Sequence, residues 1–308
     1  MLYCYPKFVR SSGLGNRLFS WARCKIYSHR HTVPMLSPHW AHVRRASITR
    51  GGIAYGNALR KILLWDNFKP AKGEICGTRR MALLLTAARI SEDIDVDQFD
   101  RDGPDKLIVF SNGPYDFADW QQARKSIYDW LREITKSKWL RASNRYSEVP
   151  IGINVRRGRD FRDPTDASEF FRAGAIRTPL DWYVKALRQT RAAIGQQAKA
   201  FVVSEGTERD LRPLLQEPDV ELVKSASAIS DLLILAKSRI LIGAGGSSFS
   251  AWASFLSGAP TVTHPGQSFQ WFKLSISGIP FVGELDVETG PSFELVQHLD
   301  KALSPLTK

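Results

Sequence analysis

The chain has 308 residues, of which 43% are hydrophobic, and this length is enough for two domains with large cores. No apolar run is long enough to span a bilayer, and the first residues lack the pattern of a secretory signal. The three cysteines are not spaced as metal ligands are, and their odd number argues against a disulfide framework. We therefore expect a cytoplasmic protein that can bind peripherally at the inner face of the membrane.

The net charge of +12 is concentrated in the first part of the chain. Residues 1–90 contain 16 lysines and arginines but only two acidic residues, whereas residues 91–308 contain 27 and 29. Such a field attracts an anionic partner, and without a nucleic-acid-binding motif we expect anionic lipid headgroups or an anionic glycan rather than nucleic acid. The alternative is charge that serves solubility alone. The basic residues expected to contact the partner are Arg44, Arg45, Arg79 and Arg80.

A strand, a glycine loop and a helix are predicted at the start of the chain. Residues 3–10 favour a strand, residues 11–16 (Ser-Ser-Gly-Leu-Gly-Asn) favour a loop, and apolar residues at helical spacing favour a helix over 18–28. A glycine loop between a strand and a helix directs backbone N–H groups toward an anion. The alternative is an ordinary strand-to-helix turn.

The rest of the first half predicts mixed α/β structure. Residues 58–65 and 80–90 favour core helices with basic edges, for which docking on a membrane surface is the alternative. A strand is expected over 107–111, and a long helix over 118–140.

The second half alternates strands with helices. The composition changes near residues 143–150, so we expect one domain over 1–145 and another over 146–308. The alternation predicts a parallel sheet whose ligands bind at the carboxyl ends of the strands. The expected strands are 151–155, 200–204, 220–223, 239–243 and 260–264, and the expected helices are 179–194, one beginning at 207, 232–238, 250–256 and 293–303.

Three strand-to-helix junctions in the second half carry residues suited to an anion. Arg156 and Arg157 end the first strand, and arginine binds phosphate through two parallel hydrogen bonds, although a solvated basic turn is the alternative. Ser204 and Glu205 follow the next strand. Residues 245–248 (Gly-Gly-Ser-Ser) let a ligand approach the backbone closely, and their serines precede a helix whose N-terminus carries partial positive charge. Together the junctions predict a diphosphate site that needs no metal.

Four segments of the sequence also resemble known motifs, and they occur in the same order as those motifs. Residues 13–19 (GLGNRLF) are similar to GLGNQLF, and residues 154–160 (NVRRGRD) are similar to HxRRGD. Residues 203–205 (Val-Ser-Glu) occupy the place of the third motif in this order, Ser-Asp-Asp. Residues 231–252 resemble the fourth, DLxLMS…NSSFSWW. On these segments, which span most of the chain, the sequence resembles the α-1,2-fucosyltransferases (glycosyltransferase family 11) and the wider group of GDP-fucose-dependent fucosyltransferases.

This resemblance implies an α/β fold of the GT-B class, in which two Rossmann-like domains face each other across a cleft. Arg156 would hold the β-phosphate of GDP, Ser247 and Ser248 would bind the diphosphate, and Asp231 would approach the guanine edge. Gly15, with its neighbour Asn16, would cover the nucleotide from the other domain. The donor-binding residues implied in this way are Gly15, Asn16, Asn154, Arg156, Ser204, Glu205, Asp231, Gly246, Ser247 and Ser248.

The sequence departs from the family pattern at several of these positions. Asn154 stands where the family has histidine, Arg159 is inserted before Asp160, and the Ser-Asp-Asp segment reads Ser-Glu-Gly here. An asparagine can still hydrogen-bond a base or a ribose. A GT-B transferase that uses a different nucleotide sugar is therefore the alternative function.

The implied reaction is the inverting, metal-independent transfer of fucose from GDP-fucose to a glycan hydroxyl. An α-1,2 linkage in a bacterial-type surface polysaccharide or glycoconjugate is expected, with a glycan or lipid-linked glycan as acceptor. Arg156 and a helix N-terminus would stabilise negative charge on the departing phosphate. Asp160, Asp163 and Asp166 are the candidates for the base, and the first two are predicted as catalytic with Arg156, although a solvated turn is the alternative for each.

Two further alternatives belong to other classes. Asp93-Ile-Asp95 and Asp95-Val-Asp97 have the spelling of a metal-binding Asp-x-Asp motif, but they alternate with other acids and follow no strand, so we expect them to be solvated. We expect no metal and no cofactor other than the donor substrate. A non-enzymatic module that binds anionic glycan or membrane with its basic N-terminal face is the second alternative.

Overall fold

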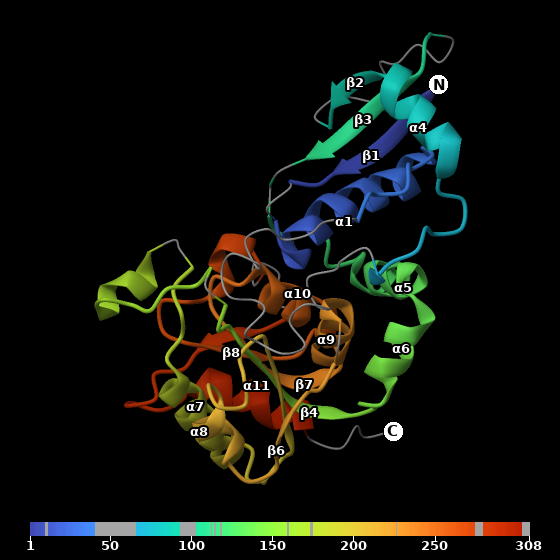
Figure 1. Cartoon of the computed structure of the whole chain (residues 1–308). Helices are drawn as coiled ribbons and strands as arrows, with labels where there is room; N and C mark the ends of the chain where they lie inside the picture. Colours follow the sequence, from blue (N-terminus) through green and yellow to red (C-terminus); the bar gives the residue numbers. More distant parts are fainter. Residues whose placement is uncertain are drawn as a thin grey trace.

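Two separate parallel sheets form the framework of the molecule (Figure 1). The computed structural model describes residues 1–9, 12–40, 66–92, 103–111, 113, 115–117, 119–158, 160–172, 175–225, 227–274 and 280–303. Two sheets, rather than one continuous sheet, are what the sequence predicts.

The first sheet has helices on both of its faces. Its strands β1 (Leu2–Lys7), β2 (Ala88–Ser91) and β3 (Lys106–Ser111) are parallel, in the order β1-β3-β2. Because successive strand residues point to opposite faces, Cys4 and Ile108 pack with α1 (Leu14–His31), whereas Tyr3 and Leu107 pack with Leu83 of α4 (Gly77–Thr86).

The second sheet has the strand order of a doubly wound nucleotide-binding fold. Its six parallel strands follow the order β6-β5-β4-β7-β8-β9, so the direction of winding reverses between β4 and β7. The strands are β4 (Val149–Val155), β5 (Ala200–Ser204), β6 (Val220–Leu222), β7 (Ser238–Ile242), β8 (Thr261–Thr263) and β9 (Val282–Glu284). The helices that follow them are α7 (Leu180–Ala193), α8 (Arg212–Leu215), α9 (Ala228–Leu235), α10 (Ser248–Ser257) and α11 (Phe293–Leu303), with single-turn 3₁₀ helices η4 (Ala167–Phe171) and η5 (Phe269–Phe272).

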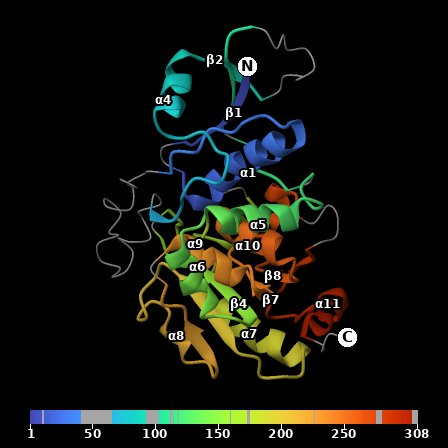
Figure 2. The ribbon, with the colours of Figure 1, turned by 90° about the vertical axis from the view of Figure 1, so that its right-hand side faces the viewer.

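Helices α5 (Arg124–Ile134) and α6 (Ser137–Asn144) connect the two halves and pack against the second sheet's helices α9 and α10. Figure 2 views the molecule from the side that carries α5 and α6. Helices α5 and α6 come before residue 145 in the sequence but contact helices of the second half. The predicted domain boundary between residues 145 and 146 therefore stays a prediction.

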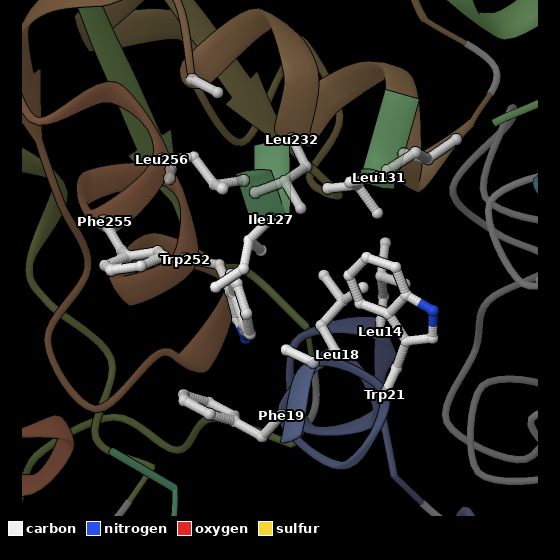
Figure 3. Packing of buried hydrophobic residues seen from close by; sticks show 14 of the residues in the cluster. Leu14, Leu18, Phe19, Trp21, Ile127, Leu131, Leu232, Trp252, Phe255 and Leu256 are labelled. Atoms are coloured by element: carbon white, nitrogen blue, oxygen red, sulfur yellow. The ribbon is translucent and has the colours of Figure 1, made fainter. Parts of the chain in front are cut away.

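One hydrophobic cluster joins the two halves (Figure 3). Helix α1 of the first half points apolar side chains at α5, α9 and α10, and the four of them labelled in Figure 3 are buried. The indole N–H of Trp252 in α10 donates to the Gly15 carbonyl in α1, at 2.8 Å. The residues labelled in this contact are Leu14, Leu18, Phe19, Trp21, Ile127, Leu131, Leu232, Trp252, Phe255 and Leu256.

Several predicted elements differ from those in the structure. The helix expected over 80–90 ends at Thr86, and the next residues form β2 because they pair in parallel with β3. The helix expected over 118–140 is two helices, because Thr135 is extended and forms a bridge with Phe68. Strand β9 was not predicted. The helix expected over 58–65 lies outside the described residues. Within the described part of the chain, no helix has both the length and the apolar character to cross a membrane.

Candidate functional site

The candidate site lies at the carboxyl ends of β4 and β7. These neighbouring strands flank the point where the winding of the sheet reverses, and doubly wound sheets bind ligands in the crevice outside that point. The Arg156 loop (residues 156–158) follows β4, and the glycine–serine loop (residues 243–247) follows β7 and leads into α10. The fold therefore brings these two predicted anion junctions together, and the third, at the end of the neighbouring strand β5, reaches the Arg156 loop through Glu205.

Two carboxylates hold the Arg156 guanidinium. Nη2 donates to Asp160 Oδ2 at 2.9 Å, Nη1 lies 3.1 Å from Glu205 Oε1, and the guanidinium carbon lies 4.8 Å from the centre of the Phe161 ring. Burial alone would lower the pKa of Arg156, but the charges of Glu205 and Asp160 outweigh it and raise that pKa. The Arg156 side chain is 18% exposed, so part of this paired guanidinium reaches the protein surface.

Glu205 also shapes the Arg156 loop. Its Oε1 accepts hydrogen bonds from the backbone N–H groups of Arg157 at 3.2 Å and Gly158 at 2.6 Å. A Cβ at position 158 would lie 2.8 Å from Glu205 Oε1 and 2.5 Å from Asp160 Oδ1, so a larger residue there would displace the two carboxylates that hold Arg156. The structure therefore gives Glu205 a positioning role toward Arg156, and its predicted contact with the donor stays a prediction.

The glycine–serine loop is held by residues that the sequence did not single out. A Cβ on Gly245 would lie 2.5 Å from the carbonyl oxygen of Gln267, so the loop is pressed against that residue. The Gln267 amide accepts from Thr178 Oγ1 at 2.6 Å and donates to the Ile176 carbonyl at 3.0 Å. No sequence signal identifies Gln267 or Thr178, because they lie 89 positions apart.

Helix α10 begins directly after the glycine–serine loop. Gly246 has a φ of 63°, which favours glycine, and Ser247 caps the helix by accepting from Ser250 N at 3.4 Å. Ser248 is the first helical residue. A helix N-terminus that carries glycines and serines can hold an anion with backbone N–H groups and hydroxyls.

A second helix N-terminus lies directly against the first. A Cβ on Gly15, in the first turn of α1, would lie 2.5 Å from Ser248 Oγ and 2.9 Å from Phe249 N. Gly13 begins α1 without a side-chain cap, and Asn16 is half-buried. The positive ends of one helix from each half therefore meet beside the glycine–serine loop, where their fields add.

The remaining predicted donor residues are buried. Asn154 is 2% exposed and its amide donates to Ser250 Oγ at 2.6 Å, so it joins β4 to α10. Asp231 is 4% exposed in the first turn of α9. Ser204 accepts from Gly206 N at 3.0 Å. Direct contact of these three residues with a donor stays a prediction.

The three candidate bases lie in different environments. Asp160 is paired with Arg156, whereas Asp163 accepts two hydrogen bonds from Arg177 Nη1, both at 2.7 Å, and its side chain is 74% exposed. Asp166 caps η4: hydrogen bonds from the Ser168 hydroxyl and backbone N–H lower its pKa. Asp166 is therefore accounted for by local structure, and Asp160 and Asp163 remain the candidates.

The basic residues expected to bind a partner have other surroundings. Arg80 donates to the Ser37 carbonyl at 2.7 Å and covers the Tyr5 ring, so it supports the first half of the fold. Arg79 is exposed. Arg44 and Arg45 lie outside the described residues, as do the Asp-x-Asp spellings at 93–97. In the described ranges no three His, Cys, Asp or Glu side chains are grouped as metal ligands, and metal independence stays a prediction.

His264, in the loop after β8, makes the stability of the fold depend on pH. The imidazole ring packs on Phe170, with ring centroids 4.2 Å apart. Burial lowers the pKa of His264. The hydrogen bond with Pro265 and the charges of Glu284, Asp181 and Asp286 act in the opposite direction but are smaller. Since the folded-state pKa lies below the unfolded value, neutral His264 stabilises the fold above about pH 6.5, and this contribution is lost as the pH falls below that value.

We expect the difference in Tm between pH 7.5 and pH 5.5 to be smaller in His264→Gln than in the parent protein. The exposed His39 provides the control, since His39→Gln should keep the parent's pH dependence. Thermal unfolding followed by circular dichroism at both pH values checks this. If the Tm difference between the two pH values is the same in His264→Gln as in the parent protein, the pKa of His264 is not lowered by folding.

Comparison with known proteins gives structural matches only. No family model matches the sequence, and no curated protein matches it. The fold is similar to that of fucosyltransferase NodZ from Bradyrhizobium, with a TM-score of 0.52 and 18% identity over 84% of this chain and 94% of NodZ. A NodZ α-1,6-fucosyltransferase co-crystallised with GDP gives 0.49 at 18% identity (84% and 93% covered), and POFUT1 in complex with GDP gives 0.46 at 12% (85% and 98%). The likeness to the first confirms the predicted α/β fold of the GT-B class.

Proposed function

We propose that the chain is a glycosyltransferase that transfers fucose from GDP-fucose to a hydroxyl group of a glycan. The proposed reaction inverts the configuration at the sugar C1, makes an α-1,2 linkage, requires no metal, and serves the synthesis of a bacterial-type surface polysaccharide or glycoconjugate in the cytoplasm. Support comes from the four family-like segments of the sequence and from a fold similar to that of the fucosyltransferase NodZ.

The observation that carries the proposal is the pairing of Arg156 with two helix N-termini. Arg156 ends β4, the helix after β7 begins at Ser248, and β4 and β7 are neighbouring strands. Gly15 of the other half packs against Ser248. A nucleoside diphosphate needs a bidentate cation and several N–H donors, and this arrangement offers both without a metal.

The chemistry assigned to these groups follows from the charge that moves. The bond between C1 and the diphosphate oxygen breaks, GDP leaves with the electron pair, and a bond forms from the acceptor oxygen to C1. Arg156 and the helix N-termini stabilise the negative charge that grows on the leaving phosphate. A carboxylate receives the proton of the acceptor hydroxyl.

Asp160 is the base that we favour, with Asp163 as the second candidate. A diphosphate bound to Arg156 would compete with Asp160 for the guanidinium, so the ion pair between them would weaken only while the donor is bound. Asp163 instead keeps both hydrogen bonds to Arg177, a residue outside the proposed phosphate contacts. Asp160 is therefore the carboxylate that donor binding would release to accept a proton.

Two alternatives remain distinct from this proposal. A GT-B transferase for another nucleotide sugar would use the same diphosphate contacts and differ at the base-binding residues, of which Asp231 is the proposed one. A non-enzymatic module for anionic glycan or membrane would use the basic N-terminal face and would make no product from a nucleotide sugar.

We expect GDP and GDP-fucose to raise the Tm of the protein more than UDP, ADP or their sugars do, with and without EDTA. A ligand at a hundred times its Kd stabilises the native state by about 2.7 kcal/mol, which corresponds to a shift on the order of 5 °C for a chain of this size. The measurement is a thermal-shift panel, followed by detection of fucosylated product. A larger shift with UDP would overturn the guanine assignment, and a requirement for divalent metal would overturn metal independence.

A further inference from the structure

Helices α5 and α6 present a strongly basic outer surface. Between residues 124 and 145 the sequence contains seven lysines and arginines but only two acidic residues. Ile127, Leu131 and Ile134 of α5 are buried in the shared core, and α6 packs against α9. Most charged side chains of the two helices are therefore left on the outer face, whereas Arg124 packs against Gly258 at the end of α10.

The basic side chains lie in stripes along this face. Lys138 and Arg141 of α6 and its C-cap residue Arg145 are spaced at i, i+3 and i+7, which places them on one side of the helix, and all three are exposed. On α5, Lys125 and Arg132 are also seven positions apart and exposed. We call these five residues the α5–α6 basic face.

Only part of this charge is neutralised within the described residues. Lys125 pairs with Asp129 at 2.7 Å, and Lys138 pairs with Asp66 at 2.7 Å. Arg132, Arg141 and Arg145 form no ion pair with any described residue, and three guanidinium groups therefore remain for an external anion. Lys237 lies beside α6, where its Nζ donates to the Ser143 carbonyl at 2.8 Å, and burial and the charge of Arg132 lower its pKa.

Aromatic side chains lie beneath the cations. Arg132 lies over the Tyr128 ring at 5.8 Å, Lys138 over the Trp139 ring at 4.7 Å, and Lys25 of α1 over Trp130 at 5.8 Å. All three rings are half-buried, so each has an apolar body in the protein and an edge near water. Tyrosine and tryptophan beside lysine and arginine are the residues that favour the headgroup level of a bilayer.

We propose that the α5–α6 basic face docks the protein on an anionic phospholipid surface. The uncompensated arginines supply the attraction, and the flanking aromatic rings suit the interface between headgroups and water. A single-stranded nucleic acid would need free ring faces on which bases stack, but here the protein's own cations cover those faces. In Figure 1 the yellow-green segment that follows β4 in the sequence lies on the left, whereas α5 and α6 lie on the right.

The test is co-sedimentation with vesicles of phosphatidylcholine alone and of phosphatidylcholine mixed with phosphatidylglycerol. We expect binding to the mixed vesicles only, and a loss of about 100-fold in affinity in the triple variant Arg132→Gln, Arg141→Gln, Arg145→Gln. The matched control removes three positive charges from exposed residues of other elements, with Arg209→Gln, Arg212→Gln and Lys301→Gln, and should bind as the parent does.

Three results would overturn the proposal, provided that both variants unfold at the parent's Tm. An equal loss of vesicle affinity in the two triple variants would assign the binding to net charge. Equal binding of the parent protein to neutral and to mixed vesicles would remove the role of the arginines. Release from the vesicles by a DNA oligonucleotide at a lower concentration than by soluble lipid headgroup would assign the face to nucleic acid. No nucleotide is added, so the result is independent of the proposed transferase function.

Discussion

Replacing Arg156 by lysine is expected to lower kcat/KM for transfer from GDP-fucose by on the order of 10²–10³ while leaving the Tm nearly unchanged. Lysine keeps the positive charge between Asp160 and Glu205, so the two carboxylates retain a partner. It cannot offer the planar fork with which arginine keeps Glu205 as a partner and binds a phosphate oxygen in place of Asp160. Steady-state kinetics of fucose transfer together with thermal unfolding measure the two effects separately.

Arg188→Lys provides the matched control for this substitution. Arg188 of α7 also donates to a carboxylate through two hydrogen bonds, to Glu217 at 3.0 and 2.6 Å, but it lies outside the candidate site. We expect its activity to equal that of the parent. Parental activity in Arg156→Lys would remove the Arg156 loop from the site, and a large fall in its Tm would show that the guanidinium serves the fold instead.

Replacing Gly15 by alanine is expected to destabilise the protein by about 1–3 kcal/mol and to reduce the Tm shift caused by GDP. The added Cβ would lie 2.9 Å from the backbone N of Phe249 as well as 2.5 Å from Ser248 Oγ, so α1 or α10 must move. Backbone cannot give way as a flexible side chain can. The movement would separate the two helix N-termini that we assign to the diphosphate. Urea unfolding and the thermal-shift panel measure the two consequences.

Gly113→Ala is the control for the added methyl group. Its Cβ would have no neighbour closer than 3.5 Å, so the free energy of unfolding should change by no more than about 0.5 kcal/mol. If Gly15→Ala keeps both the stability and the GDP shift of the parent, the close contact between α1 and α10 is not part of the site.

The elements of the second sheet could be predicted because their signals are local. Residues 151–155 and 239–243 are short apolar runs, since a parallel strand buried on both faces needs apolar side chains in succession, and β4 and β7 cover nearly the same residues. The helix expected over 293–303 agrees with α11, because its apolar residues recur at helical spacing.

The elements that the sequence did not predict depend on distant contacts. Strand β2 has three exposed residues out of four, so it shows no alternation, and it is a strand because it pairs with β3. The break between α5 and α6 occurs where Lys136 N donates to the Asn67 carbonyl and Thr135 bridges Phe68. Nothing within the predicted helix encodes a contact with residues nearly seventy positions earlier.

The sequence by itself determined which residues could bind an anion, because arginine, glycine and serine are recognised by type beside a strand end. Only the tertiary structure decided how they are arranged: Glu205 holds Arg156 from the next strand, Gln267 presses on Gly245, and Gly15 meets α10 from the other half. The basic surface divides in the same way. Composition gave the excess of positive charge, whereas helix packing and ion pairing decided that Arg132, Arg141 and Arg145 face outward without acidic partners among the described residues, since a side chain's exposure depends on what packs behind it.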